Sequence, residues 1–467
     1  MKEGDVAPAQ GAAEPSGADR QTTGQGTTPP DPQALLRSKS YLRLLVLAAL
    51  LGVPISAAAY GFLELAGYLQ GELYTHLPNG LGFHGEPPWW PLPMLAATGL
   101  ITGPVIRFLP GAGGHSPADG FKVHGPPRAA ELPGILLASL ATLTLGVVLG
   151  PEAPLIILGS GLAVLAVRLT RRDMPARATA MVAAAGSFAA ISTLFGSPIL
   201  GAFLLMETAG LGGPMLGLVL VPGLLASGVG ALIFLGLDTW TGFGTFSLSV
   251  PNLPHFARPD IAEFGWAIVI GVAAAVVGTA IRRLALAIRP YVEKRVIALA
   301  PLIGLVVAGL AIAYAEATGK SSSDVLFSGQ SALDPLVSHA ASYSAGALAL
   351  LLACKGLAYG ASMGSFRGGP VFPAIYLGAA GGIALSHLPG LPLVAGMAAG
   401  IGAMCVTMLG LPLTSVLLAT VLLSSDGIAV TPLVIVAVVV AYVSSARLAP
   451  APAPADKHDP PDPAPPR

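Results

Sequence analysis

Residues 150–154 read GPEAP, and the apolar run LIILGSGLAVLAV follows at residues 155–167. The one charged residue of this stretch, Glu152, lies between this run and residues 132–151, which carry no Lys, Arg, Asp or Glu. A helix needs about 20 mostly apolar residues to cross the hydrocarbon core of a bilayer. The stretch therefore predicts a chain that enters the membrane and carries an acid inside it.

The rest of the chain supports a membrane location. Residues 178–206, 296–315 and 368–425 are also uncharged. Of the 467 residues 54% are hydrophobic and only 10% are charged, against roughly 25% charged in soluble domains. This composition excludes a soluble globular protein. Alternation of apolar and polar residues, typical of membrane barrels, is not seen. We therefore expect an all-α polytopic membrane protein.

Charge and cysteine content limit the partners. Lys and Arg total 24, and so do Asp and Glu, so nothing points to nucleic acid. Cys354 and Cys405 both lie in apolar runs, which disfavours a disulfide framework or a metal cluster. No cofactor and no metal are expected.

The composition changes along the chain suggest five parts. We expect a disordered tail over residues 1–36, membrane repeats over 37–237 and 263–447, a more polar link over 238–262, and a Pro-rich disordered tail over 448–467. The repeats hold many of the 59 glycines and 43 prolines. Such density predicts helices that stop partway across the bilayer.

Basic residues predict the orientation, because cytoplasmic loops are enriched in Lys and Arg. Three clusters are expected on the cytoplasmic side of a multi-pass protein of the cell membrane. The loop with His76, His84, Glu86, Trp89 and Trp90 is expected outside. The three clusters are Arg37, Lys39 and Arg43; Arg168, Arg171, Arg172 and Arg177; and Arg282, Arg283, Arg289, Lys294 and Arg295.

The two halves resemble each other. LFGSPILGAFLLME at residues 194–207 matches the pattern of MLGLPLTSVLLATV at residues 408–421, which pairs Pro198 with Pro412. Upstream, GPEAP at 150–154 matches GGPVFP at 368–373, which pairs Pro154 with Pro373 at nearly the same separation. Interrupted helices in matching positions of internal repeats indicate the binding site of a transporter. Chance recurrence of Gly/Pro turns is the alternative.

Glu152 is the main functional candidate. An acid at the bilayer centre costs about 2.5–3.5 kcal/mol on insertion scales, so a functional role is the first hypothesis. Pro151 suits the first turn of a helix, which would place Glu152 and Ala153 at a helix N-terminus, where anions bind. An ionised carboxylate there would occupy an anion's place, and protonation would release it. The alternative is a plain helix-capping acid in an outer vestibule.

Further polar residues have two interpretations each. Residues 368–373 could supply a second helix N-terminus aimed at the same point, or a bland loop, with Arg367 as a cytoplasmic or vestibule charge. Glu207 could handle protons or be a structural acid bonded to backbone amides. His115 could touch a pore or cap a loop. Glu64 and Lys355 are interpreted as structural or interfacial.

One pattern points to an enzyme. Residues 360–364 read Gly-Ala-Ser-Met-Gly, which matches the Gly-x-Ser-x-Gly nucleophile pattern. That pattern requires a strand–turn–helix setting and triad partners, and this stretch is predicted to be helical. We interpret the match as fortuitous.

Together these motifs resemble the CLC family of chloride channels and proton-coupled chloride transporters, of the bacterial type without C-terminal CBS domains. The resemblance runs from about residue 42 to residue 447. The Gly-Arg-Glu-Gly-Pro of the family is here GPEAP at 150–154, and its Gly-Gly-(Ile/Val)-Phe-Ala-Pro is here GGPVFP at 368–373. The resemblance implies two inverted repeats, a homodimer, one anion pathway per subunit, and Glu152 as the gating glutamate.

The resemblance also implies anion-binding positions, with departures. Gly114 stands where the family has a serine hydroxyl, and Ser116 is not equivalent to that serine. Pro370 stands where the family has a residue whose backbone N–H binds the anion, and proline has no N–H. Ala153, Val371 and Phe372 are therefore expected, with Gly114, as the anion-binding residues.

Two further departures concern charge and aromatic groups. Pro151 replaces the arginine of the family, and Tyr442 lies in the helix before the one that carries the anion-binding tyrosine of the family. The central site is therefore expected to be weaker or to prefer a different anion.

A last departure concerns protons. The internal glutamate of many family exchangers falls at Thr208, which does not titrate, next to Glu207. This favours a passive pathway or an exchanger with a different proton path.

The sequence thus predicts a non-enzymatic anion transporter, with chloride the first candidate, protons as a second partner, and Glu207 and Thr208 as a candidate proton path. The competing interpretations are an intramembrane protease using Ser362 and a cation-coupled transporter.

Overall fold

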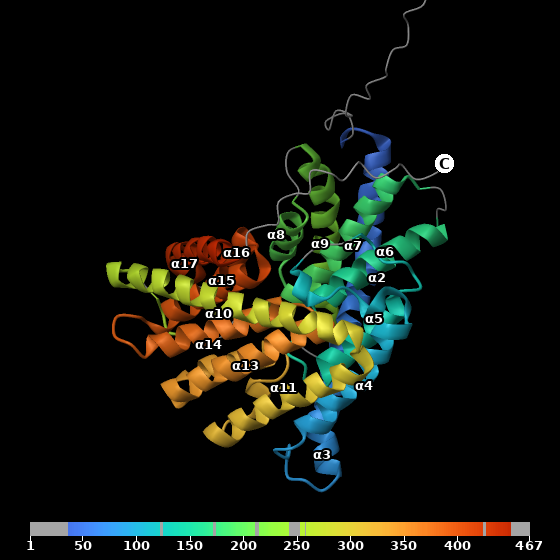
Figure 1. The fold of residues 1–467 in the computed structure, drawn as a ribbon. Helices are drawn as coiled ribbons and strands as arrows, with labels where there is room; N and C mark the ends of the chain where they lie inside the picture. Colours follow the sequence, from blue (N-terminus) through green and yellow to red (C-terminus); the bar gives the residue numbers. More distant parts are fainter. Residues whose placement is uncertain are drawn as a thin grey trace, which may run out of the picture.

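The computed structural model describes residues 36–121, 125–170, 174–210, 214–241, 253–256, 258–423 and 426–449. Nearly all of both expected tails, and much of the expected link, lie outside these residues, as do Arg171 and Arg172. The described residues form helices joined by short turns (Figure 1). The expected all-α fold is confirmed.

The first half of the chain supplies α2 to α9. Their bounds are α2 (Lys39–Gly71), α3 (Leu77–Gly80), α4 (Pro91–Phe108), α5 (Leu132–Thr144), α6 (Glu152–Thr170), α7 (Ala176–Phe195), α8 (Pro198–Thr208) and α9 (Pro214–Thr241). The π-helical turn η1 (Glu72–His76) continues α2, and two 3₁₀ turns, η2 (Pro110–Gly113) and η3 (Pro117–Asp119), lie between α4 and α5.

The second half supplies α10 to α17. Their bounds are α10 (Ile261–Lys294), α11 (Val296–Thr318), α12 (Gln330–Ser338), α13 (Ala345–Ser365), α14 (Val371–Ser386), α15 (Leu393–Leu409), α16 (Pro412–Leu422) and α17 (Gly427–Leu448). Two 3₁₀ turns, η4 (Ser322–Asp324) and η5 (Ala340–Ser342), flank α12.

Several helices are too short to cross a bilayer. Among the described residues, eight candidate spans are long and apolar enough, whereas α5, α8, α14, α15 and α16 have 10–17 residues. The expected helices that stop partway are therefore present. Helices α8 and α16 begin with Pro198 and Pro412, at the Gly/Pro turns that the sequence shows.

The two halves repeat the same packing. Helix α6 packs on α7, α7 on α9, and α2 on α9, while α14 packs on α15, α15 on α17, and α10 on α17. Helices α7 and α15 end at glycines in the left-handed conformation, Gly196 (φ 61°) and Gly410 (φ 72°). These glycines have the same separation in the chain as Pro198 and Pro412, so the repeat seen in the sequence is structural.

One pair of residues shows how the halves are related. Gly150 N–H donates to Gly369 O at 2.7 Å, and Gly369 N–H donates to Gly150 O at 2.6 Å, in an antiparallel bridge. The two glycines have the same separation in the chain as Pro154 and Pro373 and are therefore equivalent in the repeats. Two equivalent residues that exchange both bonds lie on a local two-fold axis. The expected inverted-repeat architecture is confirmed.

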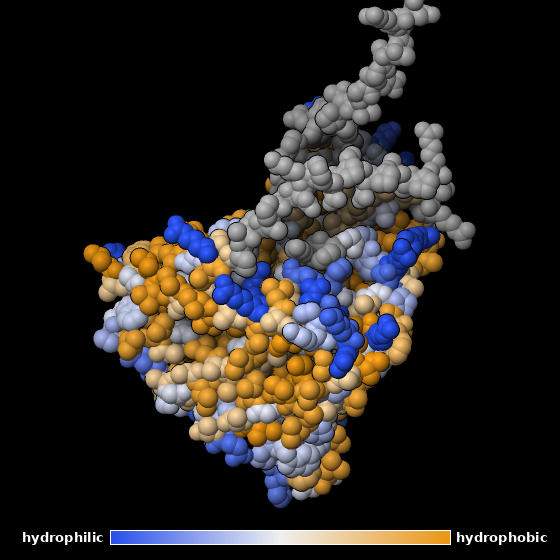
Figure 2. All heavy atoms as spheres, in the orientation of Figure 1, coloured by the Kyte–Doolittle hydropathy of each residue, from blue (hydrophilic) through white to orange (hydrophobic). Residues whose placement is uncertain are grey.

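The surface fits a bilayer. In Figure 2 apolar side chains cover most of the visible face, and hydrophilic ones gather along its upper and lower edges. Large apolar side chains are exposed on many helices, such as Leu100 (61%), Leu232 (71%) and Ile428 (84%). Exposure on this scale is typical of surfaces that face lipid or another protein. The predicted cytoplasmic orientation of the basic clusters stays a prediction.

Candidate functional site

The segment that leads into α6 is irregular and held by contacts with other elements. Tyr74 Oη donates to Leu145 O at 3.0 Å, and Phe327 N–H donates to Gly146 O at 3.2 Å. Val148 N–H donates to Ser362 Oγ at 3.4 Å. These bonds fix the backbone that ends in the Gly150–Gly369 bridge, and α6 begins two residues later.

Glu152 is the first residue of α6 and is fully buried, with 0% of its surface exposed. Pro151 caps the helix, since its carbonyl accepts from Leu155 N–H at 3.1 Å. Glu152 Oε1 accepts from Phe372 N–H at 2.8 Å, at the start of α14. The carboxylate thus lies at the N-terminus of α14, and the backbone amide of Glu152, at the start of α6, also bonds to it.

The carboxylate fits only because glycines surround it. A Cβ at Gly369 would lie 1.6 Å from Glu152 Oε2, and a Cβ at Gly150 would lie 2.4 Å from Glu152 Oε1. Glu152 Oε2 is buried and has no hydrogen-bond partner among the described residues. The bridge between the repeats therefore also forms the seat of the carboxylate.

The expected second helix N-terminus is present at the same point. Helix α14 begins at Val371, and both Val371 (0% exposed) and Phe372 (2%) are buried. The Phe372 ring stacks on Phe195, with centroids 6.0 Å apart. Behind this turn, Tyr359 Oη donates to Pro370 O at 2.7 Å. The start of α14 is thus rigidly held, with the Phe372 amide directed at Glu152.

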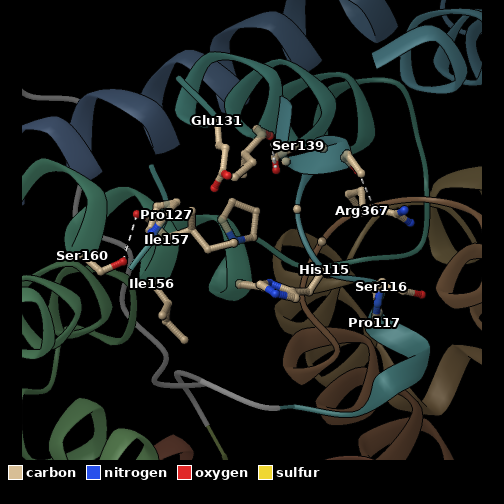
Figure 3. Close-up of a pocket in the computed structure, with 18 of the residues that line it drawn as sticks. His115, Ser116, Pro117, Pro127, Glu131, Ser139, Ile156, Ile157, Ser160 and Arg367 are labelled. Atoms are coloured by element: carbon tan, nitrogen blue, oxygen red, sulfur yellow. Dashed lines mark hydrogen bonds between the residues drawn. The ribbon is translucent and has the colours of Figure 1, made fainter. Parts of the chain in front are cut away.

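A pocket of about 500 Å³ lies beside this turn. It is formed by η2, η3, the starts of α5 and α6, and the turn before α14, and Figure 3 shows its lining. Part of the wall consists of residues that are neighbours of Glu152 or Gly369 in the chain: Ala153, Pro154, Gly368 and Pro370. The polar side chains in the lining include His115, Ser116, Glu131 and Arg367. The pocket therefore borders the turn that carries Glu152.

The predicted anion-binding residues contribute unequally. Ala153 lines the pocket, and Val371 and Phe372 form the start of α14. Gly114 lines the pocket too, but its N–H donates to Gly111 O at 2.8 Å and its φ is 99°. Gly114 therefore shapes the turn, and its amide is already used.

Glu207 and Thr208 lie at the end of α8. Glu207 accepts from Leu413 N–H (2.9 Å), Thr414 N–H (2.8 Å) and Thr414 Oγ1 (2.7 Å). The Thr208 hydroxyl donates to Leu204 O. Glu207 is thus a cap for α16, which agrees with the structural interpretation of this acid.

Lys355 has a structural position. It is fully buried, and its Nζ donates to the carbonyls of residues 324, 325, 326 and 327 at distances from 2.9 to 3.4 Å. The Nζ also lies 4.4 Å from the ring centroid of Tyr376. This clamp holds the loop that bonds to Gly146, so the structural interpretation is confirmed and the interfacial one is wrong.

The nucleophile pattern lacks its required setting. Ser362 is buried inside α13, and its Oγ accepts from Val148 N–H. A strand–turn–helix elbow is not formed there. The pattern at residues 360–364 is a helical packing surface.

Tyr359 was not identified from the sequence, and Arg367 was expected only as a cytoplasmic or vestibule charge. Tyr359 lies one helical turn after Lys355, and this spacing could have placed both on one face of a helix. Its bond to the carbonyl of Pro370 depends on the turn between α13 and α14. The sequence indicated a turn at residues 368–373, but no pattern shows which side chain bonds to its carbonyl.

Comparisons with known proteins agree with this geometry. Residues 98–446 match the model of the family described as voltage gated chloride channel. The chain is 31% identical over 369 residues to a protein of Escherichia coli O1:K1 / APEC named "Putative ion-transport protein YfeO", covering 76% of this chain and 82% of that protein. A Salmonella newport protein of the same name is 30% identical over 372 residues, covering 76% and 84%.

Solved structures share the fold. A slow cyanobacterial Cl⁻/H⁺ antiporter superposes with a TM-score of 0.70 at 18% identity, covering 87% of this chain and 95% of that one. A CLC-type fluoride/proton antiporter gives 0.65 at 18% identity, covering 87% and 96%. A eukaryotic CLC transporter gives 0.64 at 16% identity, covering 88% and 72%.

The family match covers most of the helices described above, from the middle of α4 to α17, and includes the Glu152 turn. The relatives match over more than two thirds of the chain. With its candidate spans, the chain is a multi-pass protein of the cell membrane, as expected. It belongs to the voltage-gated chloride channel family, the CLC family.

Proposed function

We propose that this protein transports monovalent anions, with chloride as the first candidate, and that Glu152 is the gate of the pathway. The observation that carries the proposal is the bond from Phe372 N–H to Glu152 Oε1 at 2.8 Å. It places an ionisable carboxylate on the first amides of α14, inside the membrane region.

The chemistry follows from the helix end. The first amides of a helix have no partners within it and carry about half a positive charge together, so they bind anions. An ionised Glu152 fills this position and repels a second anion. Protonation removes the charge, and the side chain can then leave the amides to a transported anion. The same residue thus closes the pathway at high pH and opens it at low pH.

A passive pathway fits the surroundings of Glu207. Three hydrogen bonds hold its carboxylate on α16, and the Thr208 hydroxyl is bonded within α8. These bonds engage both groups with α8 and α16, which supports a pathway without proton coupling. Proton-coupled exchange is the second candidate, because two of the structurally similar proteins are proton antiporters.

We also propose a homodimer. Helices α8 and α16 pack together and expose Ile199 (61%) and Leu413 (46%), and α17 exposes Ile428 (84%). Such an apolar surface can be covered by a second copy or by lipid. Cross-linking of an Ile428→Cys variant in native membranes would give a dimer band if this face pairs copies, and only monomer if lipid covers it.

The central experiment measures anion flux and proton flux together in liposomes that contain the purified protein. Chloride flux that rises as the external pH falls supports the proposal, and proton movement in fixed ratio to chloride would establish exchange. No anion flux under any condition would overturn it. Proteolysis lost in Ser362→Ala, or uptake dependent on Na⁺, would instead support the competing classes.

A further inference from the structure

Arg367 combines burial with the lack of a direct ion pair. It is 8% exposed, and none of the ion pairs among the described residues includes it. Glu293 and Asp119 attract its charge from a longer distance, and both are paired directly with Arg289. A buried guanidinium without a direct partner is suited to bind an anion.

The protein contacts of Arg367 are all with carbonyl groups. Its Nε donates to Ala112 O at 3.2 Å and its Nη1 donates to Phe366 O at 3.2 Å. A guanidinium carries five N–H donors, so further donors remain for a ligand. These two bonds hold the side chain across η2, at the wall of the pocket that Figure 3 shows.

Ser116 adds a second donor to the same pocket. It lines the pocket and is 8% exposed, and its Oγ has no hydrogen-bond partner among the described residues. In Figure 3 it lies on the same side of the pocket as Arg367. A buried hydroxyl without a partner costs free energy unless a ligand or water bonds to it.

The pocket lies beside the turn that carries Glu152. Arg367 directly precedes Gly368 and Gly369, and Gly369 packs against the Glu152 carboxylate. Ala153 and Pro370, on either side of that carboxylate in the two repeats, line the same pocket. An anion released from the start of α14 on this side would therefore enter a space that is lined by the Arg367 guanidinium, the Ser116 hydroxyl and the Glu131 carboxylate.

We propose that Arg367, assisted by the Ser116 hydroxyl, binds the transported anion in this pocket and sets the anion affinity of the pathway. The inference rests on the proposed function, because it names the residue that recruits the same anion. Arg367 supplies the positive charge and Ser116 a neutral donor. These two side chains would replace backbone hydrogen-bond donors that are not available to the anion. Pro151 and Pro370 have no N–H, and the N–H of Gly114 is bonded to Gly111 O.

The test measures exchange of radiolabelled chloride in liposomes as a function of chloride concentration. Arg367→Gln should raise the half-saturating concentration on the order of tenfold, because the attraction of a nearby unit charge is lost. Arg367→Lys should stay within about threefold of wild type, since the charge remains. Ser116→Ala should raise it about threefold. Arg107→Gln is the matched control, because Arg107 is an exposed arginine outside the pocket, and it should not change the value.

Wild-type half-saturation in both Arg367→Gln and Ser116→Ala would overturn the inference. If Arg367→Gln does not fold, a crystal of wild-type protein soaked in bromide decides the matter. Anomalous density within hydrogen-bond distance of Arg367 supports the site, and a pocket without bromide overturns it. Absence of any flux in wild-type liposomes would contradict the proposed function, and the bromide result would still test Arg367 separately.

Discussion

Replacing Glu152 by glutamine removes one charge at the point where the two repeats meet. The amide keeps the shape of the side chain, and its oxygen can still accept from Phe372 N–H. The variant therefore imitates the protonated carboxyl group. We expect Glu152→Gln to conduct at high pH, to show little dependence of flux on pH, and to be unable to couple anions to protons.

The magnitude follows from the geometry. Glu152 Oε1 lies 2.8 Å from Phe372 N. An anion bound to the same amide would lie about 4 Å from the carboxylate, and two unit charges at that distance repel by about 4 kcal/mol at an effective dielectric constant of about 20. This repulsion corresponds to about a thousandfold change in anion occupancy. Other steps limit flux, so the flux at high pH should rise at least about tenfold.

The assay compares chloride efflux from liposomes across a range of external pH for wild type, Glu152→Gln and a control. Glu263 is a matched control, because it is a 5% exposed acid in the capping box at the start of α10. Glutamine can also close a capping box at this position, so Glu263→Gln should keep the fold and leave the pH–flux curve unchanged.

A correctly folded Glu152→Gln protein that keeps the wild-type pH–flux curve would refute the gate. Such a result would mean that Glu152 only caps a helix, like Glu263. The reasoning would fail equally if both variants changed the curve to the same extent, because the effect would then not depend on the amides of α14.

Three further predictions concern the anion pathway, and a fourth concerns the stability of the fold. Gly369→Ala places a Cβ 1.6 Å from Glu152 Oε2, so the carboxylate must leave its seat, and the pH dependence of flux should be lost; retention of the wild-type curve would contradict the described seat. A proton gradient should not drive chloride uphill, because Thr208 does not titrate and its hydroxyl is bonded within α8; accumulation driven by pH alone would refute the passive pathway. Nitrate should pass about as well as chloride, since backbone amides discriminate little by size and Gly114 supplies no hydroxyl; a strong chloride preference in competition assays would contradict this. Lys355→Met should lower the free energy of unfolding by about 3 kcal/mol, because four buried carbonyls lose their donor; a thermal unfolding curve like that of wild type would show that the clamp is not needed.

Much of the fold could be predicted from the sequence. The charge-free runs around Glu152 and Glu207 indicated the membrane segments, and the paired prolines indicated the repeats. Both signals are local, because a helix start depends on a few neighbouring residues. The structure reproduces them at α8 and α16 and at α6 and α14.

The site was predicted less completely, because its contacts cross the repeats. Glu152 begins its own helix, as expected, and residues 368–373 were a candidate for a second helix start at the same point, but the bond from the Phe372 amide could not be predicted. The amide of Gly114 is lost to a turn that the sequence does not specify. Likewise, the bonds of Glu207 to α16 and of Tyr359 to Pro370 depend on tertiary packing. Sequence patterns identified the polar residues, and the fold determined their partners.

The reciprocal bridge between Gly150 and Gly369 has a consequence for the direction of transport. Val371 follows Gly369 by two positions, as Glu152 follows Gly150, so the acid is present on only one side of the local axis. A frame that is symmetric about an axis in the membrane plane looks the same from either face and favours no direction. Any rectification must then come from side chains that break the symmetry, and Glu152 is the one that lies against the axis itself. The Glu152 carboxylate thus makes the two sides of an otherwise symmetric backbone chemically different at this point.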